Sequence, residues 1–428
     1  MDQGTSKKKP LLSPTLQLFM LAMILANIAG NMYGPLLPLY LKSLGASVVQ
    51  IGLFFTIAQI IPLILQILGG WISDSLGRLK SIAFGSVAGI LSYVGLILAP
   101  TWQWVFAGEG FGAITRSLVG PSFGAFIAEE SAEVNRAGVY GITESIFTVV
   151  SIVGPPLGGF LVDKYSFKIM FICAAIIYTC ATLIRVSMAR RSASHESQES
   201  NGSLNLKSLR VNLGAMFGLI MAGGLVTWVL VTDGIRDISF SFSNSLLPVY
   251  LEEEGGLNAQ RIGWLSSIMG IANMLINIPA GWLADKKGER LVIILGFLFQ
   301  AGALFLFMNV NSFWGFAIVG AAFGIGIGLM TPAYQSLISK ALPAKLRGTG
   351  FGLIHSSLGV FSLPAPAIGA SLYQNYSPKM PFMITAWASL LAIIPVWAKF
   401  KITKRDEAAN EVALARLDAS EDQTDLHA

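Results

Sequence analysis

Residues 69–78 read GGWISDSLGR, and residues 280–290 repeat the phrase as AGWLADKKGER. In both copies a Gly is followed after three residues by Asp, after two more by Gly, and then by a basic residue nearby. Asp285 follows Asp74 by 211 positions, and the same offset aligns Gly158 with Gly369. At an offset one residue shorter, PLLPLYL at 35–41 aligns with SLLPVYL at 245–251. The chain is therefore interpreted as two tandem copies of one structural unit.

The composition indicates that most of the chain lies in lipid. Apolar residues make up 54% and charged residues 12% of the sequence, with a mean hydropathy of +0.64, far from the averages of soluble proteins. One helical crossing of a bilayer takes about 20 apolar residues. The stretches with few charges predict twelve crossings, at residues 15–41, 48–73, 80–98, 102–128, 136–163, 167–189, 226–251, 259–283, 289–308, 312–339, 347–374 and 379–400.

Together the repeat and the crossings predict an all-α membrane protein with 12 transmembrane helices in two six-helix bundles, related by a pseudo-two-fold axis. Parallel six-helix repeats of this kind are typical of alternating-access transporters. From residues 204–225 we expect an interfacial helix or a long extension of the seventh crossing. The predicted parts are a tail at 1–14, a bundle at 15–189, a linker at 190–225, a bundle at 226–400 and a tail at 401–428.

The distribution of positive charge predicts the topology. Most of the 29 Lys and Arg residues fall on the side of the membrane that also holds both termini, and positively charged loops stay in the cytoplasm. We therefore expect a multi-pass integral membrane protein with cytoplasmic termini, in the cytoplasmic (inner) membrane if the source is prokaryotic. This topology accounts for the net charge of +5, so the charge does not indicate nucleic-acid binding.

The opening phrase resembles motif A of the major facilitator superfamily, which lies between helices 2 and 3 and has a degenerate copy between helices 8 and 9. The resemblance implies that Asp74, at a helix end, holds the start of helix 11 near Arg347 and closes the cytoplasmic side. Glycine permits the tight turn and the close approach. The alternative is a positive loop that only sets topology. The gating residues implied are Gly70, Asp74, Gly77, Arg78, Gly281, Asp285, Gly288, Arg290 and Arg347.

A second stretch, GPPLGG at residues 154–159, is similar to motif C of the same family, with Gly154, Pro155, Gly158 and Gly159 at its positions. Motif C is associated with proton-driven antiporters that export small organic molecules. Val150 stands where the motif begins with Gly, and such clusters also serve helix packing alone. Where motif B has an early Arg, the fourth crossing has Phe106 or Glu109. Arg116 lies deeper and leaves a shifted version of the motif open, so the family's proton relay cannot simply be transferred to this chain.

Ionisable residues inside the crossings are the candidates for proton coupling, because buried charges are costly and mark substrate or proton paths. Arg236 can pair with Asp233 at i and i+3, and Arg116 could pair with Glu144, which would leave Asp237 as the principal coupling residue. Arg185 lies near a helix end, where a long side chain can reach the interface. The proton-coupling candidates are Glu109, Glu144, Asp233, Asp237 and His355.

Polar residues on the helices expected to line a central cavity are candidates for binding a substrate. On the seventh crossing Asp233, Asp237 and Asn244 share one helical face, while Asn27 and Asn31 follow the equivalent face of the first crossing. Hydrogen bonds between helices would equally explain the amides. The predicted substrate-binding residues are Asn27, Asn31, Arg116, Arg236, Asp237, Asn244, Tyr334 and Gln335.

The preferred function is secondary active transport, as proton-coupled efflux of small organic molecules or drugs by alternating access. The alternative is a proton symporter or facilitator for uptake of a small metabolite such as a sugar or organic acid. No set of nucleophile, base and orienting group can be assembled, so we expect no enzyme, cofactor or metal site. The expected partners are a small-molecule substrate, protons and membrane lipids, and the protein is expected to be a monomer.

Overall fold

The computed structural model describes residues 13–130, 136–192, 221, 223–342, 361–401, 410 and 412. The elements of these ranges are α-helices and two short 3-10 helices, η1 (Gly34–Leu36) and η2 (Trp102–Trp104). The α-helices are α1 (Pro14–Tyr33), α2 (Leu37–Ser43), α3 (Val48–Leu76), α4 (Arg78–Leu98), α5 (Val105–Glu130), α6 (Arg136–Lys164), α7 (Phe167–Ser192), α9 (Leu225–Asn244), α10 (Leu247–Glu253), α11 (Ala259–Lys287), α12 (Glu289–Phe307), α13 (Phe313–Ala341), α15 (Ala365–Asn375) and α16 (Met380–Lys399).

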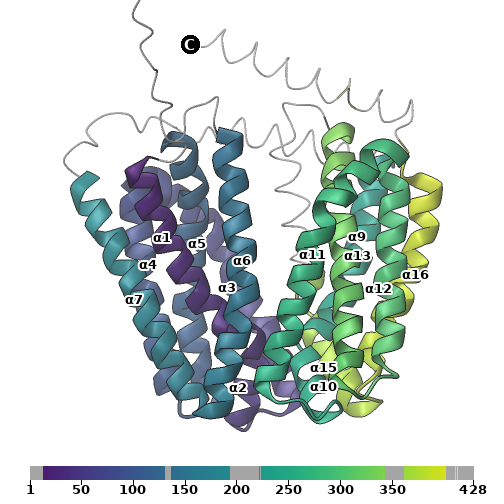
Figure 1. Ribbon diagram of the computed structural model, residues 1–428, viewed down its shortest axis with the longest axis horizontal. Helices are drawn as coiled ribbons and strands as arrows, with labels where there is room; N and C mark the ends of the chain where they lie inside the picture. Colours follow the sequence, from purple (N-terminus) through teal and green to yellow (C-terminus); the bar gives the residue numbers. More distant parts are fainter. Residues whose placement is uncertain are drawn as a thin grey trace, which may run out of the picture. The chain divides into compact units, whose positions relative to one another are not determined.

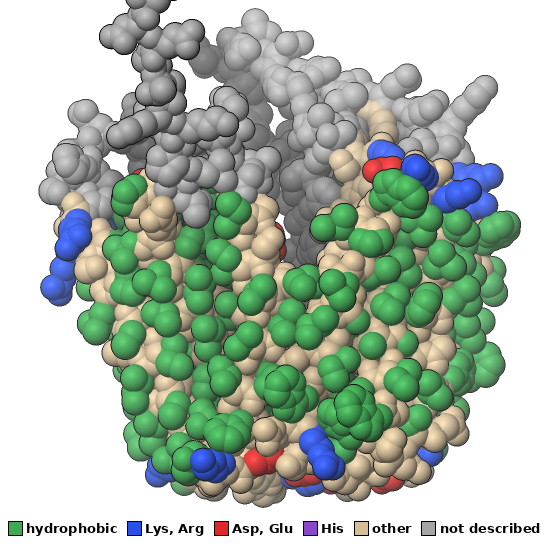
Figure 2. All heavy atoms as spheres, in the orientation of Figure 1, with side chains coloured by type: hydrophobic (Ala, Val, Ile, Leu, Met, Phe, Trp, Pro, Cys, Tyr) green, Lys and Arg blue, Asp and Glu red, His purple; other side chains and the backbone are tan. Residues whose placement is uncertain are grey.

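The all-α membrane fold expected from the sequence is confirmed. Eight of the described helical segments are long and apolar enough to cross a bilayer, where a helix satisfies all its backbone hydrogen bonds internally. In Figure 2 apolar side chains cover the middle of the visible face, and charged side chains gather near the helix ends. Two predicted crossings are each divided: the first into α1, η1 and α2, and the seventh into α9 and α10.

The chain forms two compact units. The first comprises residues 1–37 and 64–201, and the second comprises residues 38–63 and 202–428. The helix α3 contributes to both. In the first unit α1 packs on α6 and α7, while α4 packs on α5 and α7 (Figure 1). In the second unit α9 packs on α15 and α16, while α12 packs on α13 and α16. The two units thus repeat one pattern of helix contacts, as the sequence repeat predicts.

Each copy of the opening phrase ends in a one-residue turn between two helices. Gly77 separates α3 from α4 with φ of 88°, and Gly288 separates α11 from α12 with φ of 89°. A residue with a Cβ is strained at such positive φ angles, whereas glycine is not. The tight turn expected from the phrase is therefore present in both copies, and it explains why the second Gly recurs.

Two further glycines let helix backbones touch. A Cβ at Gly158 of α6 would lie 1.8 Å from the carbonyl oxygen of Met32 in α1. At the equivalent position of the second unit, a Cβ at Gly369 of α15 would lie 2.0 Å from the carbonyl oxygen of Phe242 in α9. Both distances are far below any van der Waals contact, so only glycine fits. Close approach through small residues is how helices associate in lipid.

The structure contradicts the expectation that Arg185 of α7 reaches the membrane interface. Its side chain is 2% exposed and is held inside the first unit. Nη1 donates to Ser86 Oγ at 2.8 Å, and Nη2 lies 2.9 Å from the Met23 sulfur. The guanidinium carbon also lies 5.9 Å from the centre of the Tyr178 ring. These contacts to α4, α1 and its own helix hold the side chain among the helices, which spacing from a helix end could not reveal.

The predicted interfacial helix at residues 204–225 falls largely outside the described residues, as does most of the predicted tail at 401–428. The other predicted domain limits stay predictions.

We predict that Gly158→Ala and Gly369→Ala each lower the free energy of unfolding by about 1–3 kcal/mol, because the added methyl group collides with a backbone carbonyl. The measurement is thermal or denaturant unfolding of the detergent-solubilised protein. Gly302→Ala in α12 is the matched control, since no atom lies within 4 Å of the position that its Cβ would occupy. Equal stability of all three variants would contradict the proposed backbone contacts.

Candidate functional site

The charged residues of α9 form a partly buried group in the second unit. Arg236 donates to Asp233 with 2.6 Å between Nη2 and Oδ1, as predicted from their i, i+3 spacing. Asp233 is only 9% exposed. The guanidinium carbon of Arg236 lies 5.6 Å from the centre of the Tyr334 ring of α13. The ion pair and the ring contact together compensate the buried charge of Arg236.

Asp237 follows directly on the same helix and is half-buried. Among the described residues, no hydrogen bond or ion pair of its carboxylate is found. Because Arg236 already pairs with Asp233, α9 carries one negative charge without a fixed partner in this part of the chain. A carboxylate in that position can take up a proton or bind a cation.

In the first unit Arg116 pairs with Glu109, and not with Glu144 as the sequence analysis considered. Its Nη2 lies 3.1 Å from Glu109 Oε2 on the same helix, α5. Tyr33 of α1 donates to the other oxygen of Glu109 at 3.4 Å. Glu109 is 8% exposed, so the pair replaces much of its hydration. The alternative pairing of Arg116 with Glu144 is not present, and Glu144 lies exposed on α6.

The two predicted substrate-binding asparagines of α1 donate hydrogen bonds to backbone carbonyls of their own helix. The Asn27 amide donates to the Met23 carbonyl, and the Asn31 amide donates to the Asn27 carbonyl, both at 2.8 Å. These bonds leave the side-chain oxygens available as acceptors. Asn244 and Gln335 are exposed on α9 and α13.

Of the residues predicted to act in gating in the second copy, Arg290 contacts a neighbouring helix of the second unit. Arg290 Nη1 donates to the Trp397 carbonyl of α16 at 2.9 Å, and its guanidinium carbon lies 4.3 Å from the centre of the Trp397 ring. Asp285 is exposed near the end of α11. Gly288 makes the turn described above, and Gly281 lies within α11. The gating role of every residue in the predicted set, in both copies, stays a prediction.

Some predicted residues cannot be placed. Arg347 and His355 lie outside the described residues, and so do the side chains of Gly70 and Asp74 within α3. The four motif residues of the fifth crossing are all described in α6. Gly154 and Gly158 face α1, with a Cβ at Gly154 2.5 Å from the Cβ of Asn31. Their close packing is compatible with either interpretation of the motif.

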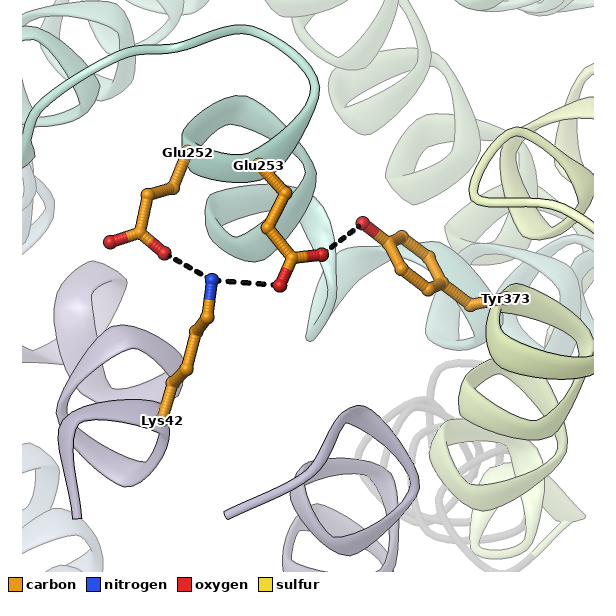
Figure 3. A network of polar contacts seen from close by, with 4 residues as sticks. All are labelled: Lys42, Glu252, Glu253 and Tyr373. Carbon is orange, nitrogen blue, oxygen red and sulfur yellow. Dashed lines mark hydrogen bonds and ion pairs between the residues drawn. The ribbon is translucent and has the colours of Figure 1, made fainter. Parts of the chain in front are cut away.

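One charged cluster was missed by the sequence analysis. Lys42 at the end of α2 lies 2.7 Å from both Glu252 Oε2 and Glu253 Oε1 at the end of α10 (Figure 3). Tyr373 of α15 donates to the second oxygen of Glu253 at 3.0 Å. The cluster thereby joins three helix ends of the second unit. The sequence could have indicated this cluster, because Lys42 and Glu252 directly follow the two aligned stretches and carry opposite charges.

Glu289 and Lys340 form another ion pair that was not predicted. Glu289, in the first turn of α12, also accepts a hydrogen bond from Ser336 Oγ of α13 at 2.9 Å. An acidic residue in a first helical turn also interacts favourably with the helix dipole. The pair stands beside the Gly288 turn and fixes the start of α12 against α13.

Comparison with known proteins identifies the family. The family model described as Major Facilitator Superfamily matches residues 19–234 and 229–421, nearly the whole chain. The chain belongs to the major facilitator superfamily. It is an integral membrane transporter and not an enzyme.

Relatives of this transporter include multidrug resistance proteins. The protein named "Multidrug resistance protein MdtG" from Escherichia fergusonii is 24% identical over 394 residues, covering 88% of this chain and 92% of the relative. The protein of the same name from Salmonella schwarzengrund is 25% identical over 397 residues, with 88% and 93% covered.

Solved transporter structures share the fold of this chain. A structure of a nucleoside transporter NupG variant superposes with a TM-score of 0.72 at 13% identity, covering 90% of this chain and 100% of its own. The peptide transporter POT in complex with sulfate superposes with a TM-score of 0.71 at 12% identity, covering 92% and 95%. At these identities the likeness establishes the fold alone.

We predict that Lys42→Gln speeds hydrogen–deuterium exchange of residues 37–43 and 247–253 by about two- to fivefold. A partly exposed ion pair contributes about 0.5–1 kcal/mol, and its loss raises the population of the locally open state by that factor. Lys42→Arg should retain slow exchange. Lys168→Gln, an exposed lysine at the start of α7, is the control. If Lys42→Gln exchanges at the rate of the unchanged protein, the cluster does not hold these helix ends together.

Proposed function

We propose that this transporter exports small organic molecules in exchange for protons. The observation that carries the proposal is the charge balance of α9, where Arg236 pairs with Asp233 and the neighbouring Asp237 has no described partner. A carboxylate that alternates between a bound proton and a bound substrate makes the two mutually exclusive. Such exclusion is the requirement for antiport at one site.

The direction of transport is supported by two independent similarities. The multidrug resistance relatives match 88% or more of the chain, and GPPLGG in α6 is similar to the motif found in proton-driven exporters. Alternating access would expose the site first to one side of the membrane and then to the other. We further propose that both termini face the cytoplasm, because the basic residues gather on their side.

Uptake by proton symport or facilitated diffusion is the competing function. The structural neighbours with the same fold are named as a peptide transporter and a nucleoside transporter. These names do not specify export, so the fold alone does not decide the direction of transport. The direction of proton movement separates the two functions. Antiport releases a proton from the compartment that the substrate enters, whereas symport brings a proton in with it.

The test is proton flux in proteoliposomes that are acidified inside and contain a pH-sensitive dye. A panel of cationic, neutral and anionic organic compounds is added outside. We predict that at least one compound raises the internal pH, as antiport requires. A fall of internal pH on adding substrate would establish symport, and a lack of any response across the panel would contradict proton coupling.

We predict that Asp237→Asn abolishes the substrate-induced proton flux and the pH dependence of transport, because the amide cannot take up a proton. Glu254→Gln, which neutralises an exposed carboxylate just after α10, is the matched control and should keep the flux. Proton flux of unchanged size in the Asn variant would remove Asp237 from the coupling mechanism and leave Glu144 and His355 as candidates.

A further inference from the structure

A cavity of about 200 Å³ lies inside the second unit, among α9, α12, α13 and α16. Asp237 and Phe240 of α9 line it together with Gln300 of α12. The exposed Thr331 of α13 is also part of the lining, so the cavity is accessible from the surface of the unit. Two of these helices, α12 and α16, carry none of the residues predicted to bind a substrate. The cavity therefore joins the charge of α9 to helices that had no expected role in binding.

Gln300 is a largely buried residue in the lining of the cavity. Its side chain is 7% exposed, and no hydrogen bond of its amide occurs among the described residues. A ligand in the cavity can supply hydrogen-bond partners for this amide. Its position is nevertheless well fixed, since a Cβ at Gly326 of α13 would lie 2.7 Å from Gln300 Cγ. The stem of Gln300 thus packs against the glycine, and its amide lines the cavity.

Part of the cavity lining is apolar and aromatic. The rings of Phe240 and Phe323 are stacked at 5.9 Å between centroids and 17° between planes, and both line the cavity with Ile327. Water molecules need two to four polar partners each, which this wall does not offer. A ligand that fills the cavity must therefore present an apolar surface to the rings and polar atoms to Gln300.

The charge of the cavity selects a cation. Arg236 and Asp237 are its two ionisable lining residues, and Arg236 already pairs with Asp233 at 2.6 Å. Among the described residues, the carboxyl group of Asp237 therefore has no charged partner. The faces of Phe240 and Phe323 also attract cations, and the carbonyl of Gln300 can accept from an ammonium group. All three features favour a protonated amine.

The volume limits the size of the ligand. Pockets for drug-sized molecules measure about 300–1,000 Å³, so about 200 Å³ accommodates one ring with a short amine chain, or the equivalent end of a larger molecule. From these features we infer that the cavity among α9, α12, α13 and α16 is a binding site for small aromatic ammonium cations. Asp237 binds the ammonium group, Phe240 and Phe323 contact the ring, and Gln300 accepts a hydrogen bond. This inference rests on the proposed export function, for which it names the substrate class.

The test is equilibrium binding to the detergent-solubilised protein by calorimetric titration, with three probes of similar shape. Phenethylammonium is the cation, 2-phenylethanol its neutral analogue and phenylacetate its anionic analogue. We expect saturable binding of phenethylammonium and at least tenfold weaker binding of the other two. Equal binding of the three probes, or no saturable binding of the cation, would overturn the assignment.

Variants locate the bound probe. Gln300→Leu and Phe323→Ala should each weaken phenethylammonium binding about tenfold, and Asp237→Asn at least as much. Thr331→Trp should close the accessible end and also weaken binding, without touching the buried residues. Gln374→Leu, at an exposed position of α15, is the control and should bind as the unchanged protein does. The unfolding temperature of each variant verifies that it is folded.

If Asp237→Asn loses the probe while Gln300→Leu, Phe323→Ala and Thr331→Trp bind it normally, the cation lies elsewhere on α9 and the cavity site is wrong. Failure of this site and failure of the proposed function are distinguishable. Proton flux driven by neutral compounds, without binding of the ammonium probe, would leave export standing and remove the substrate class. Binding in the cavity with no proton flux for any compound would leave the ammonium site standing and contradict proton-coupled export.

Discussion

The approach of α6 to α1, and of α15 to α9, sets the geometry on which the polar groups depend. Lipid offers helices no hydrophobic gain from associating with each other, so they associate through close packing and hydrogen bonds. At Gly158 and Gly369 the backbone of one helix lies directly on a carbonyl of the next. These contacts fix α1 and α9 in their units, and α9 carries Asp233, Arg236 and Asp237. A side chain at Gly369 would displace the helix that bears these charges, and one at Gly158 would displace α1 with Asn27 and Asn31.

Much of the fold could be predicted because the rules that determine it act locally. Runs of apolar residues about 20 long predict crossings, and the positive φ at Gly77 and Gly288 follows from a phrase in which only glycine suits a one-residue turn. The breaks in the first and seventh crossings were not predicted. They fall beside Pro35 and Pro248, whose lack of a backbone N–H interrupts the helical ladder.

The candidate site was predicted less well, because contacts between helices depend on rotation and depth that spacing does not give. The pairing of Arg236 with Asp233 could be predicted, since both residues lie on one helix about one turn apart. Arg116 instead pairs with Glu109 two turns away, a distance at which a long side chain must bend back along its helix. Gln300 was overlooked for another reason. It is a single amide in an apolar stretch of α12, and its place in the lining of a cavity became visible only once its neighbours were placed.

The cluster around Lys42 has a consequence for the history of the two repeats. Lys42 and Glu252 stand at equivalent positions of the aligned stretches, yet they carry opposite charges and lie 2.7 Å apart. In an assembly of two identical halves, a contact between equivalent positions brings like residues together, and two lysines or two glutamates would repel each other there. This ion pair could therefore arise only after the halves had diverged in sequence. At this position the two aligned stretches have become electrostatic complements of each other.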